Sequence, residues 1–101
     1  MKERRTIQRT PAQSLCTLFV EGRGVDARLE NLTDQGALLS LRRSIADEAP
    51  PFYLGRNVTF TVSSFTPPRR YFGKVIRLYY EGGSPHIALK FLRKYELVKD
   101  R

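Results

Sequence analysis

Residues 25–41 read VDARLENLTDQGALLSL, and this stretch sets the class of the fold. Its first six residues alternate between apolar and charged side chains, which is the period of a β-strand with one buried face. We therefore predict that Val25, Ala27 and Leu29 point inward. Asn31–Gly36 is rich in turn-forming residues, and the apolar run that completes the stretch predicts a further strand.

Strand signals recur on both sides of this stretch. Short runs rich in β-branched and aromatic residues predict strands at 14–20, 57–63, 71–80 and 86–91. Together with 25–30 and 37–41 they make six strands, with no long helix. Six strands separated by turn signals are typical of a small closed barrel or of a sandwich.

The remaining segments frame a single domain over residues 14–92. Residues 1–13 are polar and basic and are expected to form a flexible, extended arm. Residues 42–56 form a long connection in which Ser44 could begin one turn of helix. Residues 93–101 are a charged tail, expected to form a short helix or to fray.

The composition is that of one small globular domain with a basic surface. The chain has 101 residues, and 18 Lys and Arg against 10 Asp and Glu give a net charge of +8. This excess favours anionic partners: nucleic acid, nucleotides, a phospholipid surface or an acidic protein. The single cysteine, Cys16, excludes an internal disulfide. Neither a signal peptide nor an apolar run of about 20 residues is evident, so the expected location is cytoplasmic.

The sequence offers little material for catalysis. His86 is the one histidine and Cys16 the one cysteine, so a zinc site or a Cys–His nucleophile pair is poorly supplied. Asp47 and Glu48 are adjacent in the chain and do not face each other across a substrate. No phosphate loop of the Gly-x-x-x-x-Gly-Lys type occurs. We predict a binding module that is not an enzyme and has no metal or cofactor.

Three arginines lie in the arm: Arg4, Arg5 and Arg9. The planar fork of a guanidinium hydrogen-bonds phosphate oxygens or the acceptor edge of guanine, and its flat face stacks on a base. Arginines on a mobile arm could therefore hold a guanine nucleotide by edge and by face. On charge alone, solvated arginines of a terminal tail are the simpler interpretation.

A second candidate element is the turn at Asn31, Thr33 and Gly36. The Asn31 carboxamide offers a donor and an acceptor, and Thr33 offers a hydroxyl. Gly36 would let a ligand approach the backbone, and we expect it to adopt a backbone conformation that other residues resist. In isolation, the pattern is equally that of an ordinary turn.

Together the two elements resemble the ligand motifs of the PilZ domain family, whose members are bacterial receptors for the second messenger cyclic di-GMP. The family carries Arg-x-x-x-Arg in an arm before its barrel and Asp/Asn-x-Ser-x-x-Gly further along. Here Arg5–Arg9 and Asn31–Gly36 match these patterns. Residues 36–39, 73–76 and 87–91 resemble strands of the family's barrel, so the resemblance covers nearly the whole chain.

The resemblance implies both a fold and a function. The fold is a small, all-β, six-stranded antiparallel β-barrel of the split PilZ type. The function is that of a cyclic di-GMP receptor whose arm changes conformation on binding and signals to an unidentified partner protein. Arg5 and Arg9 would grip guanine and phosphate, while Asn31, Thr33 and Gly36 would form the facing surface.

Three positions bear on the details. Arg4 precedes the first motif arginine, and in this family an arginine there suits an intercalated pair of ligand molecules. Thr33 stands where the family usually has serine; it keeps the hydroxyl but adds a methyl group, which is expected to affect affinity. Ala88 stands where glycine is common, a packing change expected to lie away from the ligand.

Two alternatives remain. One is a small basic barrel that binds RNA or DNA, which would present aromatic side chains on an open sheet face. The largely inward positions expected for the aromatic residues argue against it. The other is a PilZ-like module that has lost its ligand and serves only in protein interaction.

Overall fold

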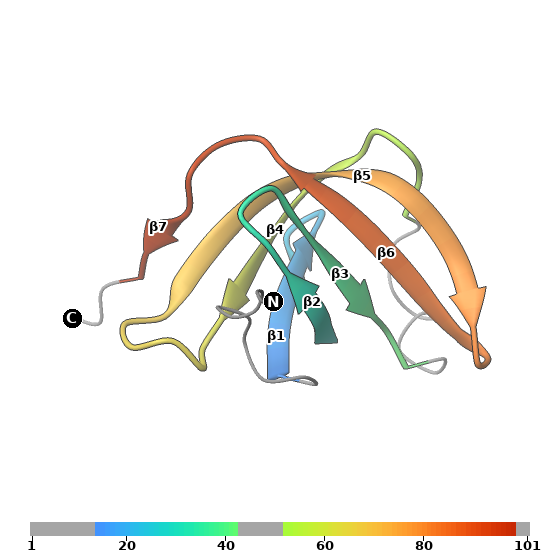
Figure 1. Cartoon of the computed structure of the whole chain (residues 1–101), viewed down its shortest axis with the longest axis horizontal. Helices are drawn as coiled ribbons and strands as arrows, with labels where there is room; N and C mark the ends of the chain where they lie inside the picture. The colour runs from blue at the N-terminus through green and yellow to red at the C-terminus, as the bar shows by residue number, and fades with distance from the viewer. Residues whose placement is uncertain (1–13, 43–51, 99–101) are drawn as a thin grey trace, which may run out of the picture.

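The computed structural model describes residues 14–42 and 52–98 (Figure 1). In these two segments the chain forms strands and no helix. The strands are β1 (Ser14–Val20), β2 (Arg23–Leu32), β3 (Gly36–Ser40), β4 (Asn57–Val62), β5 (Arg69–Glu81), β6 (Ser84–Phe91) and β7 (Glu96–Leu97). The six predicted strands are all present, which confirms the all-β class, and β7 is an addition to them.

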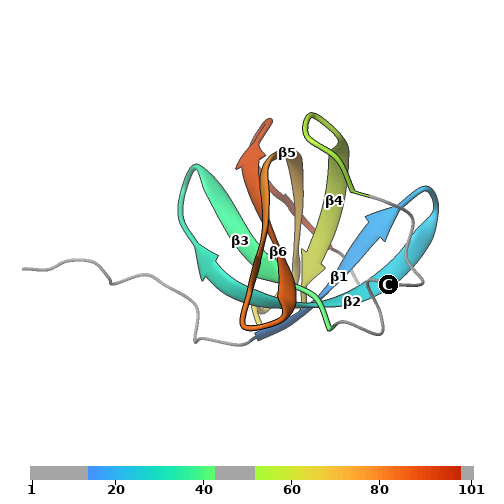
Figure 2. The same ribbon diagram turned by 90° about the vertical axis from the view of Figure 1, so that its right-hand side faces the viewer.

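The strands close into a barrel. Neighbours in the sheet follow the order β4-β1-β2-β3-β6-β5, and β5 pairs in turn with β4. Every pairing is antiparallel. Figure 2 shows these strands arranged around the barrel. Closure pairs both edges of the sheet, so the structure is a six-stranded antiparallel barrel and not a sandwich.

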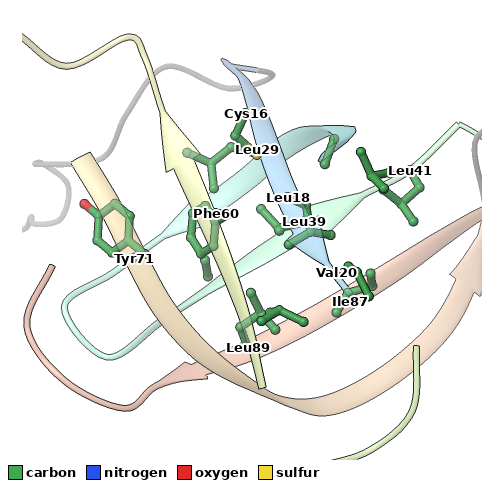
Figure 3. Packing of buried hydrophobic residues seen from close by; sticks show 14 of the residues in the cluster. Cys16, Leu18, Val20, Leu29, Leu39, Leu41, Phe60, Tyr71, Ile87 and Leu89 are labelled. Atoms are coloured by element: carbon green, nitrogen blue, oxygen red, sulfur yellow. The ribbon is translucent and has the colours of Figure 1, made fainter. Parts of the chain in front are cut away.

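The inward-facing residues of the strands fill the barrel (Figure 3). On β2, the predicted residues Val25, Ala27 and Leu29 are all buried. Phe60 is fully enclosed, and its ring stacks on that of Tyr71 with the centroids 5.1 Å apart. Burying a large apolar side chain contributes about 1.5–3 kcal/mol, so this core is the main source of stability.

β5 is the longest strand and joins two parts of the barrel. Its first half pairs with β4 and its second half with β6. At Gly73 the neighbouring strand lies close, because a Cβ there would lie 3.2 Å from the Cβ of Leu89. A register shift between Val75 and Arg77 marks a β-bulge, which bends the strand.

The C-terminal tail differs from its expected form. In place of a short helix or a frayed end over 93–101, Glu96–Leu97 pairs with Arg69–Arg70 of β5 as strand β7. The described part of the tail therefore lies along the barrel. The arm over 1–13 and the helical turn expected near Ser44 fall outside the described residues.

The aromatic residues are less uniformly buried than expected. Phe60 and Tyr71 are buried, whereas Phe19, Tyr53 and Tyr80 are exposed. The other aromatic side chains are half-buried. Burial of the aromatics is therefore a weaker argument against nucleic-acid binding than the sequence suggests.

Candidate functional site

A β-bulge turns Asn31 to the outside of the barrel. In an unbroken strand Asn31 would share the inward face of Leu29, two residues earlier. The register between β2 and β3 shifts between these two residues, and Asn31 is exposed. Within the bulge, Glu30 accepts a hydrogen bond of 2.6 Å from the Ser40 hydroxyl. The irregularity thus presents the Asn31 carboxamide to solvent.

The Asn31 carboxamide is only partly used by the protein. Its Oδ1 accepts the backbone N–H of Leu32 at 3.0 Å, which fixes the orientation of the side chain. Its NH2 group has no hydrogen-bond partner in the part of the chain that the structure describes. Asn31 therefore offers two oriented donors to a ligand.

Thr33 organises the turn with its side chain. Its hydroxyl accepts the backbone N–H groups of Gln35 at 3.1 Å and of Gly36 at 3.2 Å, and it donates to the Gly36 carbonyl at 3.3 Å. The backbone N–H of Thr33 also donates to that carbonyl, at 2.9 Å. The hydroxyl is thus engaged within the turn, and its role here is to hold the turn in shape.

Gly36 is required for a different reason from the one expected. The expectation of an unusual backbone conformation is wrong, because the φ of Gly36 is not positive. Instead, a Cβ at this position would overlap the carbonyl oxygen of Leu89. Gly36 pairs with Lys90 of β6, so the absent side chain allows β3 and β6 to pack at the base of the turn.

The outer face continues from Asn31 across three strands. Asn31 is opposite Leu38 of β3, and Leu38 is opposite Ala88 of β6. Ala88 is in turn opposite Arg77 of β5. Since directly paired side chains share a face of the sheet, these four residues form one row, which we call the outer row. Ala88 is half-buried there, two strands from Asn31.

The turn, Asn31 included, borders a hollow of about 1260 Å³, which we call the barrel-end hollow. The turn forms one wall, and the connection from β6 to β7, at the same end of the barrel in Figure 1, contributes to another. The backbone N–H of Phe91 donates to the Gln35 carbonyl at 2.8 Å and ties the two walls together. Four cationic side chains line the hollow: Arg69, Lys90, Arg93 and Lys94.

Neither the cysteine nor the histidine is placed for catalysis. Burial, together with the negative charge of Asp26, raises the pKa of Cys16 to about 12, so the reactive thiolate is scarce near neutral pH. His86 lies in β6, with Nδ1 2.9 Å from the Ser84 carbonyl oxygen and its ring stacked on Tyr79. In the described segments, no three His, Cys, Asp or Glu residues gather as a metal site requires.

A closed antiparallel barrel with a side-chain-braced turn at one end defines a small β-barrel module. Comparison with known protein families identifies the family of this module: residues 3–98 match the PilZ domain. The chain belongs to the PilZ domain family. PilZ domains are non-catalytic receptors that typically bind cyclic di-GMP. No protein with curated annotation matches the chain.

The structure brings half of the predicted ligand residues together. Asn31, Thr33 and Gly36 lie in one turn, as their spacing requires. The other three lie outside the described residues: Arg4, Arg5 and Arg9. Over residues 14–42 and 52–98 there is also no helix long and apolar enough to cross a membrane.

One cluster in the hollow was not predicted from the sequence. The Arg69 guanidinium contacts the rings of Phe65 and Tyr95, which lie far apart in the chain. No local motif links the three residues. One feature of the sequence could have indicated this cluster. Arg69 lies two residues before the buried Tyr71 and so on the inward face of β5, where a charged side chain is unusual.

Proposed function

We propose that this protein is a cyclic di-GMP receptor that passes the signal to a partner protein. The observation that carries the proposal is the exposed Asn31 carboxamide, whose NH2 group is unused by the described residues, on a braced turn. Membership of the PilZ family supports cyclic di-GMP as the ligand. The net charge of +8 favours an anionic ligand of this kind.

Covalent connectivity limits how far the motif arginines can lie from this turn. Ser14, where the first described segment begins, pairs with Leu29, two residues before Asn31. An extended chain spans at most about 3.6 Å per residue. Over the five residues to Arg9 this amounts to about 18 Å, and over the nine to Arg5 to about 32 Å. Both arginines can therefore reach a ligand held at Asn31.

The two elements supply complementary chemistry. Arg5 and Arg9 would hold guanine by its O6 and N7 edge, or stack on its face, and would pair with the phosphates. The NH2 group of Asn31 would donate to a ligand acceptor from the opposite side. Thr33 would act by holding the turn, because its hydroxyl is engaged there.

Arg4 bears on stoichiometry. A third guanidinium beside the motif would give an intercalated pair of cyclic di-GMP molecules an additional stacking surface. We expect calorimetry to saturate at two ligands per chain. Saturation at one ligand per chain would remove the paired arrangement and leave the receptor function intact.

The signal would pass through residues 1–13. Fixing a backbone costs about 1–2 kcal/mol per residue, so contacts to the ligand must exceed that cost if the arm is ordered on binding. A change in the conformation of the arm would alter the surface presented to the partner protein. Comparing the amide resonances of residues 1–13 with and without cyclic di-GMP tests this step.

Isothermal titration calorimetry with cyclic di-GMP, GTP and a short RNA tests the function. Of the three compounds, we expect only cyclic di-GMP to bind tightly. Arg9→Ala or Asn31→Ala should weaken the binding of cyclic di-GMP by about 10- to 100-fold, because each variant loses hydrogen bonds to the ligand. Matched controls are Arg42→Ala and Asn57→Ala, both exposed and away from the turn.

The remaining outcomes would contradict the proposal. RNA binding with a steep salt dependence would make the protein a nucleic-acid-binding barrel. Absence of binding to all three compounds would make it a protein-interaction module. Unchanged affinity in Arg9→Ala would remove the arm from the site.

A further inference from the structure

The side chain of Arg69 is held in place inside the barrel-end hollow. Its Cζ lies 3.9 Å from the ring centroid of Phe65 and 4.3 Å from that of Tyr95. These two rings make no contact with each other in the described structure, so they approach the guanidinium from different sides. Nη1 donates a hydrogen bond of 3.3 Å to the Tyr71 hydroxyl. The guanidinium is therefore positioned before any ligand arrives.

The charge of Arg69 is not balanced by a neighbouring acid. Among residues 14–42 and 52–98, no carboxylate forms an ion pair with it. The adjacent Arg70, by contrast, lies 3.9 Å from Glu96. Asp34 is the acidic residue among the described lining of the hollow, set against four cations. A partly buried cation without a counter-charge attracts an anion strongly, because desolvation leaves the charge poorly compensated.

The geometry also selects the kind of anion. A guanidinium can stack on a base through its face or hydrogen-bond an oxyanion through its edge. Phe65 and Tyr95 both lie against the Arg69 guanidinium, where they compete with a guanine for stacking. What remains is the edge, where N–H groups not used by Tyr71 can bind phosphate oxygens in a fork.

We propose that the barrel-end hollow is a phosphate-binding site centred on the edge of Arg69, with Lys90 and Lys94 as supporting charges. These two lysines have no partner among the described residues. Asn31 itself lines the hollow together with Thr33, Asp34 and Gln35 of the motif turn, so a ligand held at Asn31 borders it. That a phosphodiester of cyclic di-GMP supplies the phosphate rests on the function proposed above; the anion site itself does not.

This arrangement implies different roles for Arg69 and for the arginines of the arm. The arm arginines could serve as both face and edge ligands of guanine. Arg69, with two rings already against it, would bind the phosphate part of the ligand through its edge. With about 1260 Å³, the hollow exceeds the usual range for a drug-sized ligand, about 300–1,000 Å³, and has room for more than a bare phosphate ion.

Two measurements on the full chain test the proposal. In the first, the side-chain Nε–Hε resonance of Arg69, assigned by its loss in Arg69→Gln, is followed by NMR during titration with cyclic di-GMP and with inorganic phosphate. We expect both to shift it, cyclic di-GMP at far lower concentration. A shift by phosphate at concentrations as low as those of cyclic di-GMP would identify free phosphate as the physiological anion.

In the second, calorimetry compares Arg69→Gln with its matched control Arg70→Gln, which lies next to it in β5 and pairs with Glu96. We expect Arg69→Gln to weaken cyclic di-GMP binding by about 10- to 100-fold, the cost of losing charge-assisted hydrogen bonds, and Arg70→Gln to stay within about twofold. Arg69→Lys, which keeps the charge but not the fork, should fall between them.

The results separate this proposal from the receptor function. If wild-type protein binds cyclic di-GMP and Asn31→Ala loses it, while the Arg69 resonance stays unmoved and Arg69→Gln binds normally, the receptor function stands. The contacts of Arg69 in the hollow then serve only to hold the C-terminal segment against the barrel. If cyclic di-GMP does not bind but phosphate shifts the Arg69 resonance, the anion site stands and the receptor function fails. If Arg69→Gln does not fold, Arg69→Lys, which also lacks the Nε–Hε group, serves to assign the resonance and replaces it in the calorimetry.

Discussion

Strand β2 is joined to its two neighbours by loops of opposite character. The β1–β2 loop is minimal: Glu21 and Gly22 both have positive φ, at 53° and 78°, which matches the twist of a two-residue hairpin. The β2–β3 loop carries a bulge and the side-chain hydrogen bonds of Thr33. It ends at Gly36, where a Cβ would overlap a neighbouring strand.

The contrast shows that the β2–β3 loop has features that are not needed to reverse the direction of the chain. The Gly82–Gly83 loop between β5 and β6 is of the same minimal kind as the β1–β2 loop, with both residues at positive φ. Chain reversal in this barrel therefore needs neither a bulge nor a braced side chain. The extra features at Asn31–Gly36 fix an exposed carboxamide and form a wall of the basic hollow, as the proposed ligand site requires.

The largest expected effect is a difference in stability between glycine substitutions in the two loops. Gly36→Ala should lower the free energy of unfolding by about 3 kcal/mol, since the new Cβ must displace the backbone of Leu89. Gly22→Ala has open space around it and should cost about 1–2 kcal/mol, from its positive φ alone. Urea denaturation measures both, and equal losses would show that the two loops pack alike.

In β1, the buried thiol of Cys16 should make the free energy of unfolding depend on pH. The pKa of Cys16, raised to about 12 against an ordinary 9.0, means that the folded state favours the neutral thiol. Its contribution is complete below pH 9 and is lost as the pH rises towards 12. At about 1.4 kcal/mol per pH unit, stability should fall by roughly 2–3 kcal/mol over two units.

Cys16→Val removes this titration and serves as its control. The valine variant should show a flatter decline in unfolding free energy over the same alkaline range. Identical profiles for the two proteins would mean that the Cys16 thiol is not held neutral by the core.

A smaller effect tests the bracing of the β2–β3 turn. Thr33→Val removes the acceptor of two backbone N–H groups and should cost about 1 kcal/mol, with weaker binding of cyclic di-GMP. Thr33→Ser keeps the hydroxyl and should retain the stability. Thr59→Val is the control, because the Thr59 hydroxyl has no partner in the described structure. Equal stability of Thr33→Val and wild type would show that the brace is dispensable.

The smallest effect concerns the outer row. Ala88→Gly should cost about 0.5–1 kcal/mol of stability, since glycine weakens a strand. Its binding of cyclic di-GMP should change by no more than about twofold, because two strand spacings, about 10 Å, separate Ala88 from Asn31. A change in affinity above about tenfold would extend the ligand surface along the row to Arg77.

Local periodicity made the barrel largely predictable from the sequence. The inward positions of Val25, Ala27 and Leu29 follow from alternation and are confirmed. Alternation also fails where it matters most, because it assigns Asn31 to the inside. The bulge that turns Asn31 outward depends on the pairing of β2 with β3, which no residue of β2 encodes alone.

The site was predictable as a motif and not as a set of contacts. The spacing of Asn31, Thr33 and Gly36 identified the turn, but the outward orientation of Asn31 and the need for glycine at Gly36 depend on the pairing with neighbouring strands. The need for glycine at Gly36 arises from Leu89. The cluster around Arg69 joins side chains from a loop, a strand and the tail, and the strand formed by the tail depends on the edge of β5.

The most direct test of the central claim compares the two loops of β2 in one titration. Cyclic di-GMP is added to the isotopically labelled protein, and the backbone amide resonances of Asn31–Gly36 and of Glu21–Gly22 are followed by NMR. We predict that the resonances of Asn31–Gly36 shift and saturate while those of Glu21–Gly22 stay in place. Saturable binding that leaves Asn31–Gly36 unmoved would contradict the assignment of this turn as the ligand site.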